Sequence, residues 1–178
     1  MDVVAHLRLL AQYNRWMNEK LYAAAATLPH EAVTRDRGAF FKSILGTLNH
    51  LVVTDILWMH RLGTHPAGFR ALAPALRMDK PTALDLVLHH DLASLAGTRR
   101  ALDDIFFAWT DEIAAPDLDA VIEYQNMKGV THRKLFGSLM LNLFSHHAHH
   151  RGQATALLAQ AGADVGVTDL LALIPDAA

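Results

Sequence analysis

The sequence contains no cysteine, so disulfides, thiolate metal ligands and a cysteine nucleophile are all excluded. Aromatic residues are also few, at 7%, and charged residues make up only 19% of the 178 positions. With 52% hydrophobic residues, this composition is typical of a compact helical protein and not of a disordered chain. The formal net charge is -2, so the chain has no excess of the basic residues that nucleic-acid binding requires. We therefore expect no nucleic-acid partner.

Long uncharged apolar runs are absent as well. No stretch approaches the ~18 residues that a membrane-spanning helix needs, so we expect no membrane partner. The opening residues, MDVVAHLRLL, contain no basic segment followed by an apolar run and predict no secretory signal. We therefore expect a cytoplasmic protein. The length fits one domain over residues 1–178.

The apolar residues that are present recur at three- and four-residue spacing, which predicts amphipathic helices. We expect four of them, over roughly residues 2–27, 40–62, 82–110 and 131–161. Thr82 is the expected N-cap of the third helix, with Asp85 three positions later. Four helices joined by one long crossover predict an all-α fold, a four-helix bundle.

Two segments outside these helices also carry a pattern. Val121 to Tyr124 and Asn126 to Gly129 resemble a short extended pair around a turn. The apolar tail, from Val165 to Pro175, is expected to pack back onto the helices.

Histidine is the residue in excess, with twelve in the chain and four in the pentapeptide HHAHH. Within this cluster only His146 and His150 are four residues apart, about 40° around a helix, so their side chains share a face. The three-residue pairs, His146 with His149 and His147 with His150, could also meet. An i, i+4 histidine pair lets two imidazoles bind one ion without bending the helix.

One stripe along the fourth helix favours His146 and His150 as the inward pair. It runs at three- and four-residue steps through Phe136, Leu139, Leu143, His146, His150, Gln153 and Leu157. His147 and His149 fall away from this stripe and are expected to face outward. Burying two imidazoles without a partner is unfavourable, and a shared metal ion removes that penalty.

A catalytic metal ion usually has three protein ligands and one open position, so a third ligand is expected from another helix. His50 stands in the middle of the second helix among apolar neighbours, although a single histidine there is more often a hydrogen-bonded core residue. Glu123 and His60 are alternatives, and spacing alone cannot choose among the three.

Several segments together resemble the DinB family. SILGTLNHLVVTDILWMHRL is similar to the second helix of that family, and LFSHHAHHRGQATALL is similar to its fourth, with the signature of histidine, three residues, then His-Arg-Gly-Gln. YNRWMNEKLYAAA and EYQNMKG also fit. The resemblance implies a four-helix bundle of up-down-down-up topology, a homodimer, and a nickel- or zinc-type ion held by His50, His146 and His150.

The resemblance also implies a function, a metal-dependent transferase that acts on a small-molecule substrate with a low-molecular-weight thiol. Three neutral imidazoles would leave a bound ion its full charge and make it a strong Lewis acid, able to lower the pKa of a bound water or thiol. A non-catalytic metal-binding, stress-related protein and a metal-dependent hydrolase are the alternatives. Histidine suits zinc, nickel, copper and iron alike, so the donor set does not identify the metal.

Two charged residues lie close to the predicted ligands in sequence. Arg151 is a candidate for binding the carboxylate of a substrate or cofactor, with an ion pair at the surface or between helices as the alternative. Asp55 follows His50 by five residues, about 140° around the helix, and so does not obviously face the metal. We expect it either to hold another helix or to orient a ligand.

Overall fold

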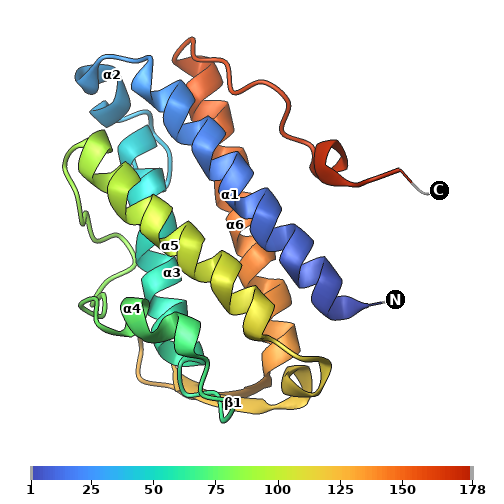
Figure 1. The fold of residues 1–178 in the computed structure, drawn as a ribbon. Helices are drawn as coiled ribbons and strands as arrows, with labels where there is room; N and C mark the ends of the chain where they lie inside the picture. The colour runs from blue at the N-terminus through green and yellow to red at the C-terminus, as the bar shows by residue number, and fades with distance from the viewer. Residues whose placement is uncertain (1, 177–178) are drawn as a thin grey trace.

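The computed structural model describes residues 2–176, and over these residues the protein is predominantly helical with one small two-stranded sheet. The predicted helical class is confirmed. About half of the described chain lies in four long helices: α1 (Val3–Ala26), α3 (Ile44–Leu62), α5 (Leu92–Glu112) and α6 (Phe136–Gln160). They lie side by side, with α1 and α6 running in one direction and α3 and α5 in the other (Figure 1).

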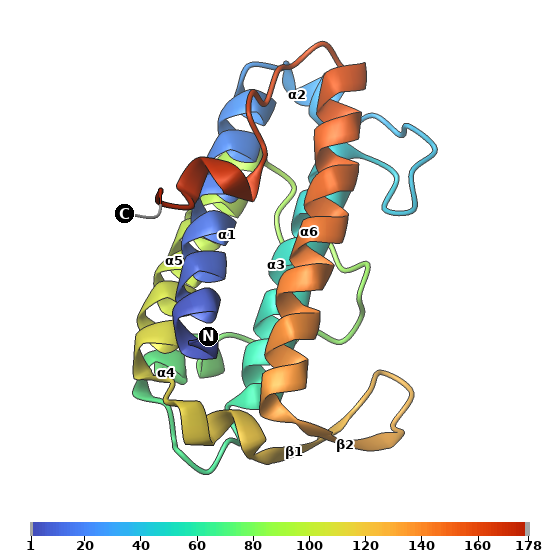
Figure 2. The same ribbon diagram turned by 90° about the vertical axis from the view of Figure 1, so that its right-hand side faces the viewer.

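Each long helix contacts two others, so the four enclose a common core (Figure 2). The largest side chains with almost no exposure include Trp109 and Phe106 of α5, Phe136 of α6 and Leu48 of α3. Burying such side chains removes apolar surface from water and is the main contribution to the stability of this arrangement. Over residues 2–176, no helix combines the length and hydropathy needed to cross a membrane.

Side-chain caps mark the beginnings of three of the long helices. Asp2 accepts hydrogen bonds from the backbone N–H groups of Val4 and Ala5, which would otherwise lack partners at the start of α1. Ser43 caps α3 in the same way, and Asp91 caps α5. The second helix therefore begins at Ile44, a few residues later than the predicted position 40.

The third long helix begins at Leu92, so the prediction of a start at Thr82 is wrong. Residues 82–91 instead form an irregular segment against α3 (Figure 1). The side-chain oxygen of Asn49 accepts hydrogen bonds from the backbone N–H groups of Leu88 and His89, and its amide donates to the carbonyl of His89. These contacts bridge some 40 residues of sequence, so no local pattern could reveal them.

The two strands, β1 (Val121–Gln125) and β2 (Thr131–Leu135), pair antiparallel with Val121 opposite Leu135. The first predicted extended segment is confirmed, but the second, residues 126–129, is the turn. Asn126 accepts hydrogen bonds from the N–H groups of Lys128 and Val130, which closes that turn. Consequently α6 begins at Phe136, five residues after the predicted start at Thr131.

Short helical segments complete the connections. They are α2 (His30–Thr34), η1 (Arg70–Leu72), α4 (Ala73–Leu76), η2 (Ala115–Asp119) and η3 (Leu170–Leu173). The tail crosses beside α1 (Figure 2), where the Tyr13 hydroxyl donates to the carbonyl of Thr168 at 2.6 Å. Val165 is buried, and η3 contacts α1 with Leu170 and Leu173 half-buried, so the tail packs back onto the helices as predicted, although Leu171 is 72% exposed.

Candidate metal centre

His50 of α3 meets His146 and His150 of α6. Each histidine offers one ring nitrogen, and these three atoms lie within 4.8 Å of one another. The ring centroids of His50 and His146 both lie 4.4 Å from that of His150. The structure therefore brings together the three residues predicted as ligands, from two helices that run in opposite directions.

Hydrogen bonds fix the tautomers of two of these rings. The Nδ1 of His50 lies 2.8 Å from the backbone oxygen of Leu84, which can only accept, so Nδ1 carries the hydrogen and Nε2 the lone pair. The Nδ1 of His150 lies 2.7 Å from Oε1 of Gln153. In this orientation of the amide its nitrogen faces Nε2 of His149 at 3.1 Å, and Oε1 accepts the Nδ1 hydrogen of His150. His150 therefore also presents a lone pair on Nε2.

These two lone pairs face each other. The Nε2 atoms of His50 and His150 are 3.2 Å apart, and neither carries a hydrogen in the tautomers just assigned, so they form no ordinary hydrogen bond. A cation between them would satisfy both. Among residues 2–176 the Nδ1 of His146 has no hydrogen-bond partner although it is buried, and a nitrogen of this third ring lies within 4.8 Å of the other two ligand atoms. The donor set thus fits a transition-metal ion.

A proton is a poor candidate for that cation at neutral pH. Burial lowers the pKa of His50 to about 4 and that of His146 to about 3, and it lowers the pKa of His150 as well. Burial favours the uncharged ring, and for His146 the neighbouring histidines add to the effect. The three imidazoles are therefore neutral at pH 7, the form that binds metal ions.

Two cavities open beside the three histidines. One, of about 550 Å³, is lined by Phe41, Asp85 and His149 among others. The second, of about 390 Å³, lies toward the β1–β2 hairpin. Phe41 stacks on His50 with ring centroids 3.8 Å apart and shields one face of the imidazole. A further cavity, of about 560 Å³ between α1, α2 and α5, contains none of the three histidines.

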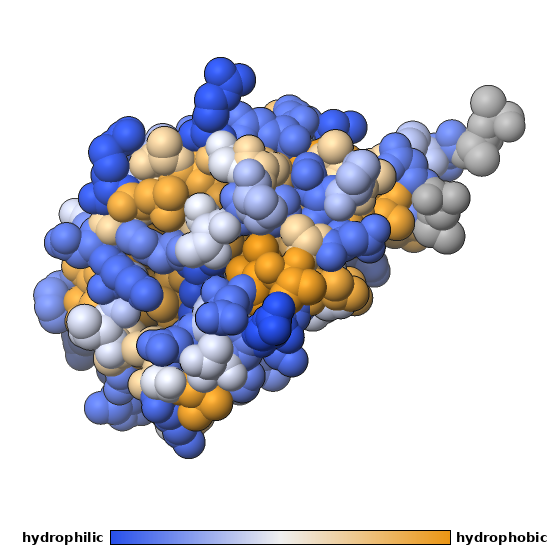
Figure 3. Space-filling model, turned by 90° about the horizontal axis from the view of Figure 1, so that it is seen from below, coloured by the Kyte–Doolittle hydropathy of each residue, from blue (hydrophilic) through white to orange (hydrophobic). Residues whose placement is uncertain are grey.

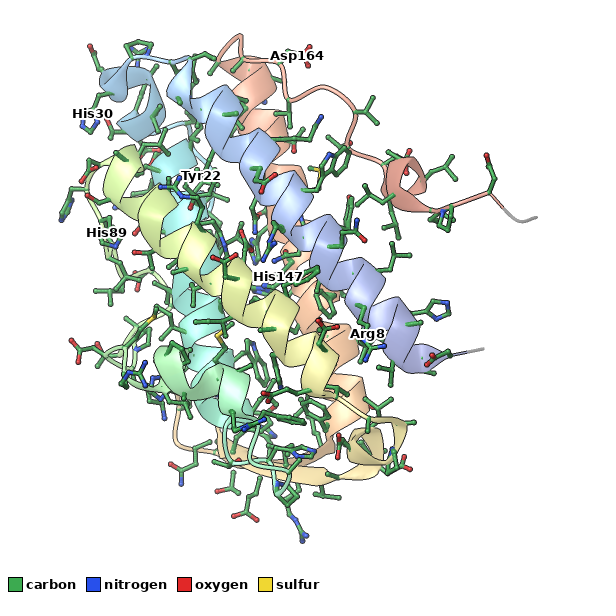
Figure 4. All side chains as sticks on the ribbon, viewed as in Figure 1. Arg8, Tyr22, His30, His89, His147 and Asp164 are labelled. Carbon is green, nitrogen blue, oxygen red and sulfur yellow. The ribbon has the colours of Figure 1, made fainter. Side chains whose placement is uncertain are left out.

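His147 was expected to face outward, and this prediction is wrong. It is 1% exposed and lies in the interior of the four helices (Figure 4). The buried positions of α6 alternate in steps of three and four, and the arc they cover includes His147 as well as His150. His146 is only partly buried and lies at the edge of that arc, beside the cavities.

The partner of His147 is Asp55 of α3. Nε2 of His147 contacts one carboxylate oxygen, and Arg99 of α5 donates to the other. Burial alone would raise the pKa of Asp55, but the charges and hydrogen bonds of His147 and Arg99 outweigh it and hold this pKa at about 2. Asp55 therefore holds helices together and touches none of the three predicted ligands.

This contact is part of a larger buried network. Arg99 also pairs with Asp103 at 2.9 Å, and Asn14 of α1 donates to the same oxygen of Asp103 at 3.1 Å. Arg151 of α6 donates to the side-chain oxygen of Asn14. The contacts pass from α6 to α1, α5 and α3 and back to α6, so one polar network joins all four long helices.

Arg151 is accordingly in an interhelix position. Its side chain is 3% exposed, and its guanidinium carbon lies 5.0 Å from the centre of the Tyr13 ring. It lines neither cavity beside the histidines. The role proposed for it from the sequence, binding a substrate or cofactor, stays a prediction that this position does not favour.

The alternative third ligands lie elsewhere. Nε2 of His60 is 3.0 Å from the backbone oxygen of Met78, and Glu123 is exposed on β1, 3.8 Å from Arg133. Sequence reasoning missed three residues that contact the histidines: Gln153 and Leu84, which hydrogen-bond to His150 and His50, and Phe41, which stacks on His50. Only Gln153 left a signal, because it follows His150 by three residues and so lies within reach on the same helix.

Comparison with known proteins decides the family. The model of the DinB family matches residues 1–176. The chain belongs to the DinB family. It is 26% identical over 161 residues to Protein DinB of Bacillus subtilis (strain 168), a match that covers 90% of this chain and 88% of that protein. No solved structure matches the chain.

Proposed function

We propose that this DinB family member binds one divalent transition-metal ion, nickel or zinc, through His50, His146 and His150. The observation that carries the proposal is the pair of Nε2 lone pairs that face each other at 3.2 Å. The proposal includes the architecture expected for the family, an up-down-down-up four-helix bundle, and the helix directions in Figure 1 support it.

The residues around the histidines have a defined task in this proposal. The carbonyl of Leu84 and the side chain of Gln153 keep the hydrogens of His50 and His150 on Nδ1, so that both Nε2 atoms stay free to bind. Three neutral ligands would leave the ion its charge. When bound, the ion would supply Lewis acidity, which lowers the pKa of a coordinated water or thiol.

We further propose that the protein is a metal-dependent transferase that uses a low-molecular-weight thiol on a small-molecule substrate. Family membership and the two cavities beside the histidines support this. A metal-dependent hydrolase is the second candidate, since Asp85 lines the larger cavity and offers a carboxylate that could accept a proton from water. The cavity toward the hairpin contains no such base.

Elemental analysis of untagged protein, followed by titration of chelator-treated protein with nickel and zinc, tests metal binding. We expect about one ion per chain, and each substitution His50→Ala, His146→Ala and His150→Ala should weaken binding strongly because two ligands remain. His60→Ala, on the same helix as His50 but bonded to the carbonyl of Met78, is the matched control and should bind nearly as the wild type does. Equal losses in all four variants would mean that the three histidines do not form a defined site.

A second measurement separates the two reactions. Small thiols should change the ultraviolet and visible spectrum of the nickel-loaded protein, and alcohols of the same shape should not. If thiols leave the spectrum unchanged and the protein hydrolyses esters or amides in a manner that depends on Asp85, the hydrolase is favoured.

A further inference from the structure

Arg61, near the end of α3, lies against two aromatic rings and has no carboxylate partner among residues 2–176. Its guanidinium carbon is 4.8 Å from the centre of the Trp58 ring and 5.1 Å from that of Tyr124 in β1. Such stacking uses the flat faces of the guanidinium and leaves its N–H edge free. The Nε of Arg61 is buried and has no hydrogen-bond acceptor within this described part of the chain.

This side chain lines the cavity of about 390 Å³ toward the hairpin, a size that suits a small-molecule ligand. The same cavity is lined by His50 and His146, and Lys128 of the hairpin turn lies on its wall. No aspartate or glutamate contributes to the lining. The cavity thus has positive charge at one end and two of the proposed metal ligands at the other.

The spacing along α3 sets the length of the cavity. His50 and Arg61 are eleven residues apart, so they are offset by about 16 Å along the helix and only about 20° around it. Thr54 and Trp58 lie between them on the same side, and both line the cavity. Helical side chains tilt toward the N-terminus, so the guanidinium leans back toward His50. A ligand that reaches both ends must be extended.

Glu123 is the acidic residue next in sequence to Tyr124, yet it does not neutralise Arg61. Successive side chains of a strand point to opposite faces, so Glu123 points away from Tyr124. It faces Arg133 of β2 instead, with 3.8 Å between Oε2 and Nε. Arg61 therefore remains a half-buried cation beside an acid-free cavity.

We propose that this cavity binds a small, extended organic carboxylate, with the carboxylate on the N–H edge of Arg61 and the other end at His50 and His146. A planar guanidinium matches a carboxylate with two parallel hydrogen bonds, and Lys128 adds a second positive charge. The inference rests on the proposed function for the end of the ligand that reaches the histidines. It assigns Arg61 as the residue that selects carboxylate-bearing thiols over neutral ones.

Calorimetric titration of the zinc-loaded protein with two matched probes, mercaptohexanoate and mercaptohexanol, tests this assignment. The wild type should bind the carboxylate about tenfold or more tightly than the alcohol. Arg61→Gln should remove that preference while its affinity for zinc and for mercaptohexanol stays unchanged. Arg133→Gln, on the hairpin that packs against Arg61 but exposed and paired with Glu123, is the control and should keep the preference.

A purely structural Arg61, holding the hairpin on α3, predicts a different pattern. Arg61→Gln would then weaken both probes alike or neither, and either result would overturn the proposal. Calorimetric titration of chelator-treated protein with hexanoate and hexanol tests the carboxylate site in the absence of metal. If the wild type holds no ion, the proposed function fails, but hexanoate binding that depends on Arg61 would still support the carboxylate site. Hexanoate binding that ignores Arg61 would overturn it.

Discussion

The ring of His147, which lies inside the four helices (Figure 4), contacts the carboxylate of Asp55 of α3. His147 is the residue after His146 on α6. Asp55 lies five residues after His50 on α3. The contact therefore joins the two helices that carry the three predicted ligands, close to the level at which those ligands meet. Arg99 binds the second oxygen of the same carboxylate and ties α5 to this point.

Removing the charge of Asp55 should destabilise the fold. We expect Asp55→Asn to lower the free energy of unfolding by about 3 kcal/mol or more, because it leaves the buried Arg99 and His147 without their shared anion. Urea denaturation measures this. Glu123→Gln is the control, since it breaks an exposed pair and should change stability by less than about 1 kcal/mol. Similar effects of the two substitutions would mean that the buried contact contributes little.

Gln153 should matter for metal affinity although it is not a predicted ligand. Its Oε1 holds the hydrogen of His150 on Nδ1, and losing such a partner typically weakens metal binding about 10–100-fold. We therefore expect that weakening in Gln153→Ala, measured by competition with a chelator of known affinity. Gln160→Ala, exposed on the same helix, should bind like the wild type. An unchanged Gln153→Ala would show that His150 keeps its tautomer without this bond.

Lowering the pH should destabilise the metal-free protein already at pH values above those at which carboxylates titrate. The pKa values of His50 and His146 are lowered to about 4 and about 3 by burial, whereas in the unfolded chain they return to about 6.5. Between these values the unfolded chain binds more protons, so stability is fully present above pH ~6.5 and falls as the pH drops toward 4.

Urea denaturation of chelator-treated protein between pH 7 and pH 4.5 measures this dependence. His50→Gln should make it shallower, since one of the three histidines whose pKa values burial lowers no longer titrates. His6→Gln removes a histidine that is exposed on α1 and should keep the wild-type dependence. A stability that does not change over this pH range would contradict the assigned burial of the two rings.

We expect the protein to be a homodimer that uses helix faces, with the tail from Val165 to Pro175 as a further candidate. Several large apolar side chains are exposed, among them Leu141 at 63% and Leu171 at 72%. In Figure 3 apolar surface gathers in patches between polar side chains at the end of the molecule seen from below. Sedimentation at micromolar concentration should show a dimer. A monomer at that concentration would contradict the prediction.

The predictable part of the site came from local spacing. The pair His146 and His150 follows from helical periodicity, and His50 could be named as a candidate because a histidine is unusual among apolar neighbours in the middle of a helix. Spacing left Glu123 and His60 open, and the resemblance to the DinB family chose His50. The packing of α3 against α6, which spacing within one helix does not contain, then brings His50 to the other two histidines.

The failed predictions have separate physical origins. His147 was placed outside because a single line of positions was taken as the inward face of α6, whereas the buried arc is wider. Hydropathy also marks histidine, arginine and aspartate as surface residues, so a hydropathy pattern does not predict a buried polar network that joins four helices. The start at Thr82 failed because Asn49, distant in sequence, fixes residues 88 and 89 in an irregular conformation.

The carbonyl of Leu84 that holds the His50 hydrogen belongs to the same segment that Asn49 anchors. Opening this segment would free Nδ1 of His50 and let the ring change tautomer. The proposed ion binding would therefore be thermodynamically linked to closure of this segment, and each would favour the other by the same free energy. The amide hydrogens of Leu88 and His89 would then exchange more slowly with solvent when the ion is bound, although neither residue contacts it.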